Sequence, residues 1–172
     1  MPDTPMLLSP MQLATGDLER ELAITRRMLE RVPEEHLAWK PHEKSMSLGT
    51  LAAHLANLLW WQTTTLERDE FDVAAPQPPR TAPESREALL QAFDEKAAVL
   101  REALARTDEA ALASPWTLRR GDHIIFTMPK AAVLRSFGIS HIVHHRGQLS
   151  VYLRLLDVPV PPSYGPTADE AV

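Results

Sequence analysis

Apolar residues recur every three or four positions in four separate stretches of the chain, with charged residues on the opposite side. This spacing predicts amphipathic α-helices. The four predicted helices cover approximately residues 9–31, 47–68, 83–106 and, from a start between 127 and 130, the stretch up to 158. Ser47 suits the N-cap of the second helix, and Pro129 suits the first turn of the last.

The segments between these helices carry different signals. Residues 33–41 are bracketed by prolines and are too short for a full helix, and the proline-rich residues 73–83 read as a loop. Residues 107–128 alternate loosely, contain a Gly-Asp pair and end in β-branched and aromatic residues, which fits a short hairpin or an irregular crossover. The proline-rich residues 159–172 are expected to pack as an extended strip or to fray.

Four amphipathic helices without an internal repeat predict an all-α fold, a four-helix bundle in which the hairpin or irregular insertion precedes the last helix. We expect one domain over residues 1–172. The longer connectors, after the second and third helices, allow a crossover instead of simple up-down neighbours.

Composition excludes several classes of function. Eighteen Lys and Arg against 23 Asp and Glu give a net charge of −5, and no basic cluster exceeds pairs such as Arg26-Arg27, so nucleic acid is not an expected partner. No apolar run reaches the roughly 20 residues of a membrane span, and the N-terminus lacks a signal peptide's features. We therefore expect a cytoplasmic protein. The chain has no cysteine, so any metal ion must be held by nitrogen or oxygen.

The stretch SHIVHHRGQL, residues 140–149, contains three of the seven histidines. His141 and His145 are four positions apart and therefore lie one turn apart on the same helix face. In the second helix, His54 shares the inward stripe of Leu51 and Leu58. The predicted inward stripe of the last helix is Leu134, Phe137, His141, His145, Gln148, Tyr152 and Leu155.

A single histidine on an apolar face is usually a hydrogen-bonded core residue. Three imidazoles in one core, without a carboxylate placed to pair with them, are costly unless a common partner binds them, and a divalent metal ion is such a partner. His54, His141 and His145 are thus the predicted ligands. The competing pair is His141 with His144, but Gln148 extends the line from His141 to His145, so we expect His144 to support the ligands or to lie in an interface.

Three further residues are candidates for the pocket. Gln148 is expected either to hydrogen-bond a ligand or a metal-bound water, or to cap the cluster as a core amide. Arg146 can pair with a substrate carboxylate or a neighbouring subunit, although a surface position is favoured. Trp61 can wall the pocket, although core packing is favoured. No Asp or Glu stands where it clearly serves as a general base, so the sequence assigns no catalytic residue.

Two blocks of the sequence resemble a known family. HIVHHRGQL closely resembles the H-x-x-H-H-R-G-Q signature on the last helix of the DinB/YfiT-like superfamily of metal-binding four-helix bundles, and AWKPHEKSMSLGTLAAHLANLLWW resembles that family's second block. The resemblance implies an up-down-down-up bundle with its long crossover after the second helix, frequent homodimers, and ligands at His54, His141 and His145. Nickel or zinc are the metals it implies, with low-molecular-weight thiols as co-substrates in characterised relatives.

Three neutral imidazoles leave a divalent ion with unfilled coordination positions, which is typical of catalytic sites. The expected function is a metal-dependent enzyme that activates a low-molecular-weight thiol to attack a small-molecule electrophile, an S-transferase. The alternatives are a metal-dependent hydrolase that uses metal-bound water and a non-catalytic metal-binding bundle.

A homodimer is also expected, because Trp60 and Trp61 leave more apolar surface on the second helix than one inward stripe can bury. The alternative is that residues 69–82 or the C-terminal tail cover this surface within one chain.

Overall fold

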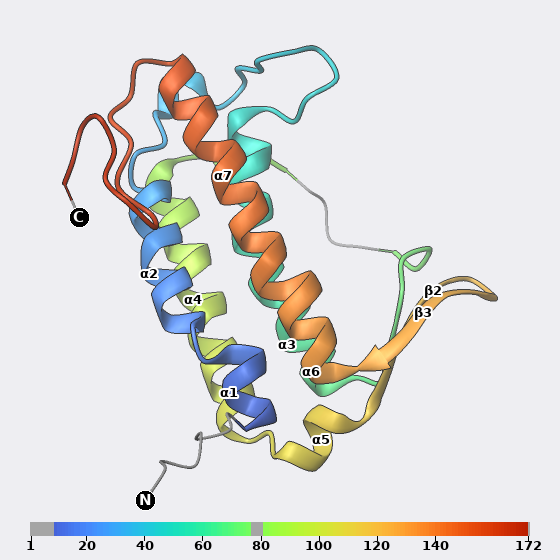
Figure 1. Ribbon diagram of the computed structural model, residues 1–172. Helices are drawn as coiled ribbons and strands as arrows, with labels where there is room; N and C mark the ends of the chain where they lie inside the picture. Colours follow the sequence, from blue (N-terminus) through green and yellow to red (C-terminus); the bar gives the residue numbers. More distant parts are fainter. Residues whose placement is uncertain (1–8, 77–80, 172) are drawn as a thin grey trace, which may run out of the picture.

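The computed structural model describes residues 9–76 and 81–171, most of which are helical (Figure 1). In Figure 1, α2 and α7 run in one direction along the molecule, and α3 and α4 run in the opposite direction. α3 contacts both α4 and α7, and α2 contacts the same two helices. No helix among the described residues has the length and apolar content to cross a membrane. The four long helices are α2 (Leu18–Leu29), α3 (Leu48–Glu67), α4 (Arg86–Ala105) and α7 (Ser140–Leu155).

Shorter elements join the long helices. The helical ones are α1 (Pro10–Thr15), the 3-10 turn η1 (Glu34–His36), α5 (Glu109–Ala113), α6 (Lys130–Val133) and the π-helical segment η2 (Leu134–Ile139). The strands are β1 (Glu70–Asp72), β2 (Pro115–Arg120) and β3 (His123–Pro129).

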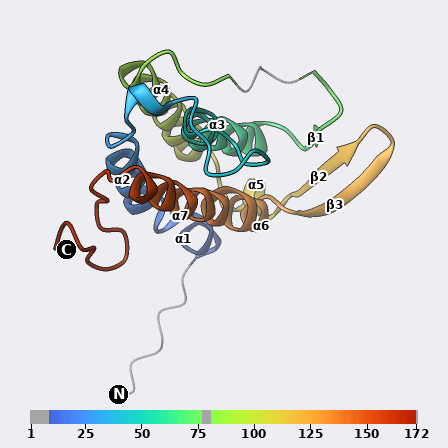
Figure 2. The same ribbon diagram turned by 90° about the horizontal axis from the view of Figure 1, so that it is seen from above.

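The three strands form a small sheet in the order β1-β2-β3, so the expectation of an all-α fold is wrong in this respect. β1 pairs with β2 in parallel, and β2 pairs with β3 in antiparallel. The β2–β3 hairpin projects away from the helices (Figure 2). This hairpin confirms one of the two structures expected for residues 107–128. Its turn contains Gly121 at a φ of 57°, a conformation that glycine adopts without strain.

Two predicted helix boundaries differ from the structure. The first helix is broken at Gly16 and Asp17 and forms two helices, α1 and α2. Glycine suits the break, because an added Cβ at Gly16 would lie 2.5 Å from the carbonyl oxygen of Gln12. The third helix begins at Arg86 because the hydroxyl of Ser85 caps it by accepting from the backbone N–H of Ala88. Ser47 caps α3 as predicted, and α6 begins within the predicted window. Part of the predicted loop, residues 77–80, lies outside the described residues.

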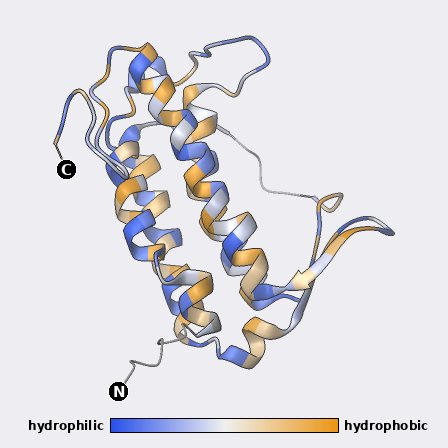
Figure 3. Ribbon diagram, viewed as in Figure 1, coloured by the Kyte–Doolittle hydropathy of each residue, from blue (hydrophilic) through white to orange (hydrophobic). Residues whose placement is uncertain are grey.

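Leucine dominates the core between the long helices. Leu55, Leu59, Phe93, Leu100 and Leu149 are almost fully buried. Hydrophobic and hydrophilic positions alternate along each helix in Figure 3, as the spacing in the sequence predicts. The buried apolar faces explain why the four long helices pack against one another.

The C-terminal tail packs as an extended strip along α2 and α7, one of the two expected outcomes (Figure 1). Glu170 forms ion pairs with Arg27 of α2 and with Arg31 in the turn that follows α2, and Asp169 pairs with Arg154 of α7. Val172 lies outside the described residues. The charges near the end of the tail therefore tie it to two helices.

The two adjacent tryptophans of α3 are covered within the chain. Trp60 contacts Phe71 of β1, with ring centroids 6.0 Å apart, and Trp61 contacts Trp116 of β2 at 5.3 Å. The sheet thus covers part of the surface that a second copy of the chain was expected to cover, and both tryptophans stay half-buried. The homodimer stays a prediction that rests on the family resemblance.

Arg146 is buried, and the expectation of a surface position is wrong. It is 2% exposed, as is Glu21 of α2, and the two side chains form an ion pair at 2.7 Å. The guanidinium also donates to the backbone carbonyl of Glu21, to the hydroxyl of Thr25 and to the hydroxyl of Tyr164 in the tail. Tyr164 in turn donates to the Glu21 carboxylate at 2.9 Å. This network joins α2, α7 and the tail, and it satisfies both buried charges.

We predict that Glu21→Gln destabilises the protein by about 3 kcal/mol, because it leaves the buried Arg146 charge without its counter-ion. Glu19→Gln is the matched control on the same helix, since Glu19 pairs with Arg101 in an exposed position. That change should cost less than about 1 kcal/mol. Urea unfolding followed by far-UV circular dichroism measures both, and equal losses in the two variants would contradict the network's role.

Candidate metal centre

Three histidines from two helices meet at the contact between α3 and α7. Each of His54, His141 and His145 offers a ring nitrogen, and these nitrogens all lie within 4.8 Å of one another. The Nε2 atoms of His141 and His145 are 2.9 Å apart. The ring of His54 stands edge-on to that of His145, with centroids 4.5 Å apart. The residues selected from helix spacing therefore converge in space.

The packing of α3 against the start of the last helix depends on a small residue. A Cβ on Gly138 would lie 2.7 Å from Oε1 of Gln62, a buried residue of α3. Glycine therefore lets the two helices approach closely just before His141.

The last helix presents a different face to the core from the predicted stripe. Its least exposed residues are Ile142, Arg146, Leu149 and Leu153, whereas Leu155 is 58% exposed. The cause is η2, because a π-helical segment contains more residues per turn than an α-helix and so shifts the phase of everything after it. His141 consequently lies at the edge of the core beside α3, where it is half-buried, instead of at the core's centre.

The environment of the cluster favours the neutral form of at least one imidazole. His145 is buried, and this burial lowers its pKa below the ordinary value; the hydrogen bond with Gln148 opposes the shift without reversing it, and neighbouring His144 adds to it. Only a neutral imidazole has a lone pair available for a metal ion. His145 is thus suited to metal binding at neutral pH.

Gln148 orients His145. Its Oε1 lies 2.7 Å from Nδ1 of His145, so the hydrogen bond is made when that Nδ1 carries the proton. This tautomer leaves Nε2 of His145 unprotonated and directed toward His141. A histidine that binds a metal through one nitrogen commonly donates from the other in this way. Gln148 thus hydrogen-bonds a candidate ligand, and because its side chain is exposed, the alternative expectation of a core amide is wrong.

The other residues that the sequence proposed for the pocket do not contribute to the three-histidine group. His144 is exposed, and its ring lies edge-on to that of His145 at 4.8 Å. Arg146 reaches α2 and the tail, and Trp61 packs against Trp116 of the sheet. The cluster that the described residues form contains no Asp or Glu.

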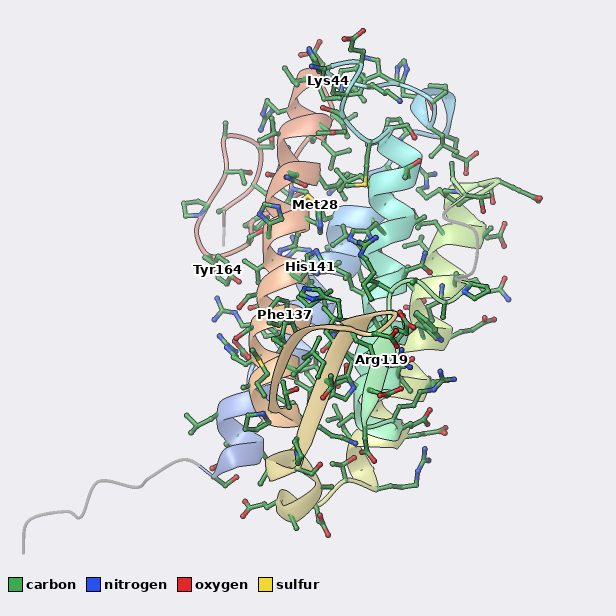
Figure 4. The ribbon with its side chains drawn as sticks, turned by 90° about the vertical axis from the view of Figure 1, so that its right-hand side faces the viewer. Met28, Lys44, Arg119, Phe137, His141 and Tyr164 are labelled. Carbon is green, nitrogen blue, oxygen red and sulfur yellow. The ribbon has the colours of Figure 1, made fainter. Side chains whose placement is uncertain are left out.

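Sequence reasoning missed the aromatic side chains next to the cluster. Phe126 of β3 stacks on Phe137 of η2, with ring centroids 4.7 Å apart. Figure 4 shows Phe137 and His141 close together on the side of the last helix that faces the hairpin. The spacing of four positions between Phe137 and His141 could have indicated that they are neighbours on the helix. Nothing in the sequence indicated that the hairpin places Phe126 against Phe137.

Comparison with known proteins agrees with this architecture. The model of the DinB family matches residues 16–171. The chain belongs to the DinB family. The chain is also similar to YrdA of Bacillus subtilis (strain 168), an uncharacterized protein. The two sequences are 26% identical over 156 residues, and the match covers 88% of this chain and 86% of YrdA.

Two crystal structures of DinB-like proteins share the fold. One, from Bacillus cereus ATCC 10987, has a TM-score of 0.65 and 20% identity, and covers 88% of this chain and 95% of its own. The other, YjoA from Bacillus subtilis, has a TM-score of 0.68 and 19% identity, and covers 88% of this chain and 97% of its own. At these identities the likeness shows the fold alone.

The donor set of this DinB family member fits a divalent ion. Three nitrogens bound to one tetrahedral ion at about 2.1 Å lie about 3.4 Å from one another. The separations here, from 2.9 Å up to a limit of 4.8 Å, bracket that value. The three nitrogens are therefore close enough together to be ligands of one ion.

We predict that His54→Ala, His141→Ala and His145→Ala each abolish tight binding of zinc or cobalt, because two imidazoles hold such ions far more weakly than three. His144→Ala is the matched control, since it removes an adjacent exposed histidine and should retain one ion per chain. Equilibrium dialysis with elemental analysis measures the stoichiometry. Equal loss in the His144 variant would show that the ligand set is wrong.

Gln148→Ala should weaken metal binding about 10- to 100-fold while leaving the stoichiometry at one, because His145 loses the acceptor that fixes its tautomer. Ser140→Ala, at an exposed position of the same helix, should leave the affinity unchanged. Competition against a chromogenic chelator gives both dissociation constants. An unchanged affinity in the Gln148 variant would remove Gln148 from the site.

Proposed function

We propose that this DinB family protein is a metal-dependent enzyme that activates a low-molecular-weight thiol for attack on a small electrophile. His54, His141 and His145 would hold the divalent ion, with nickel or zinc as the expected metals. The observation that carries the proposal is the convergence of three imidazole nitrogens, with no further His, Asp or Glu donor in the group among the described residues. Structural zinc sites commonly close with four protein ligands, whereas catalytic sites keep a position open.

The charge of the ligand set supports activation of a thiol. Neutral imidazoles do not offset the charge of a divalent ion, and within the described parts of the chain no carboxylate joins the cluster. When bound there, such an ion supplies strong stabilisation of a thiolate or hydroxide at neutral pH. The protein's own contribution is to hold three nitrogens in place, to keep His145 neutral by burial and to orient its ring through Gln148.

The proposal also includes the arrangement of the four long helices. The four long helices would form the four-helix bundle, up-down-down-up, that the resemblance implies. The directions of the helices in Figure 1 and the contacts of α3 and α2 with both α4 and α7 support it. In such a bundle, ligands project inward from facing helices, as the histidines of α3 and α7 do.

Hydrolysis by metal-bound water is the second candidate, because the same open position would serve it. No Asp or Glu of residues 9–76 and 81–171 belongs to the cluster, which favours the thiol reaction, since hydrolases of this kind commonly use a carboxylate as general base. A non-catalytic metal-binding protein is the third candidate, and a turnover assay separates it from the other two.

We predict thiol-dependent turnover of 1-chloro-2,4-dinitrobenzene when the zinc- or nickel-loaded protein is incubated with bacillithiol, mycothiol or glutathione. Protein purified without a metal-affinity column is assayed by absorbance for the thioether, and against a p-nitrophenyl ester for hydrolysis. The rate above background should vanish in His141→Ala, which loses a ligand, and persist in His144→Ala.

Three results discriminate between the candidates. Thioether formation with an unreactive ester supports the transferase. Ester hydrolysis without thioether formation supports the hydrolase and contradicts the proposal. One bound ion per chain with neither activity across all three thiols supports a metal-binding protein without this catalysis.

A further inference from the structure

A continuous row of aromatic rings crosses from α3 over the hairpin to the last helix. Trp61 of α3 contacts Trp116 of β2 at 5.3 Å between ring centroids, and Trp116 contacts Phe126 of β3 at 6.1 Å. Phe126 then stacks on Phe137 of η2, with centroids 4.7 Å apart and an angle of 20° between the ring planes. The hairpin therefore joins α3 and the last helix through aromatic contacts.

The row lies next to the metal centre on one particular side. On α3, Trp61 follows His54 by seven positions, which is two helical turns, and on the last helix Phe137 precedes His141 by four. Because α3 and α7 run in opposite directions, both spacings lead toward the same end of the molecule. Figure 4 shows the same arrangement, with Phe137 adjacent to His141 on the side of the molecule from which the hairpin projects.

Phe137 keeps part of its ring accessible. It is 36% exposed, although Phe126 stacks on it, whereas Trp116 at the centre of the row is fully buried. Ile124 and Ile125 of the hairpin are also exposed. The charge of Arg119 on β2 is neutralised by Glu70 and Asp72, so this cation is engaged within the sheet. The Phe126–Phe137 stack thus presents a partly exposed aromatic ring next to His141.

We propose that the Phe126–Phe137 stack is the surface on which the metal centre's substrate places a flat aromatic group. This inference rests on the proposed metal centre and adds the class of substrate: an aromatic electrophile whose reacting atom lies at the ion and whose ring packs on Phe137. Small-molecule sites commonly combine an apolar aromatic wall with a few polar groups that fix orientation. Aromatic pairs gain contact energy beyond the area that they bury.

Two metal-binding probes that differ only in their apolar part test this inference without turnover. Acetohydroxamate and benzohydroxamate chelate through the same two oxygens, and their binding to the cobalt-loaded protein is followed by the visible spectrum of the ion. We expect benzohydroxamate to bind about tenfold more tightly than acetohydroxamate, the factor for about 1.4 kcal/mol of ring contact. Phe137→Ala and Phe126→Ala should reduce this ratio to about one or two.

Two controls separate a binding surface from a support for the hairpin. Leu155→Ala removes an exposed apolar side chain from the same helix, far from the histidines in sequence, and should leave the ratio unchanged. Phe137→Leu retains apolar packing under the hairpin but lacks a ring, so it should retain acetohydroxamate affinity and lose most of the preference for benzohydroxamate.

Each outcome decides between the claims. A wild-type ratio near one, or a ratio that Phe137→Ala and Phe137→Leu leave unchanged, overturns the aromatic surface while the metal centre stands. A parallel fall in affinity for both probes assigns the stack to supporting the hairpin alone and also overturns it. Failure of the protein to bind cobalt contradicts the proposed function itself, and the aromatic surface with it.

Discussion

The rotational setting of the last helix against α3 is the constraint on which the candidate site depends. A helix turns by about 100° per residue, so an error of one residue in this setting would direct His141 and His145 away from His54. Two features of the chain act on this setting. The π-helical segment η2 shifts the phase just before His141, and Gly138 lets Gln62 of α3 approach closely at that segment.

The buried ion pair secures the same helix turn from another side. Arg146 directly follows His145, so their side chains leave the helix about 100° apart, one toward α2 and the tail and the other toward α3. Burying two charges is unfavourable in itself, and the network with Thr25 and Tyr164 offsets that cost only in one geometry. We infer that the pair contributes more to the specificity of the helix setting than to stability. The tail, which supplies Tyr164, takes part in this arrangement.

The sequence allowed the four long helices and the three converging histidines to be predicted, because both follow from local periodicity. Helix spacing alone relates His141 to His145, and the inward stripe of α3 includes His54. The burial of Arg146 was not predictable, since its partner Glu21 lies 125 positions away and an unpaired arginine is usually exposed. The π-helical segment has no distinctive composition, and three-residue β1 is too short to show an alternating pattern. The break at Gly16 was visible as a glycine, but an isolated glycine is tolerated within many helices.

X-ray absorption spectroscopy of the metal-loaded protein, before and after addition of the thiol, tests the central claim most directly. We expect three imidazole ligands completed by light atoms from solvent, and a new sulfur neighbour at about 2.3 Å once the thiol is present. A coordination shell closed by a fourth protein ligand, or a shell that the thiol leaves unchanged, would contradict a centre that activates thiols.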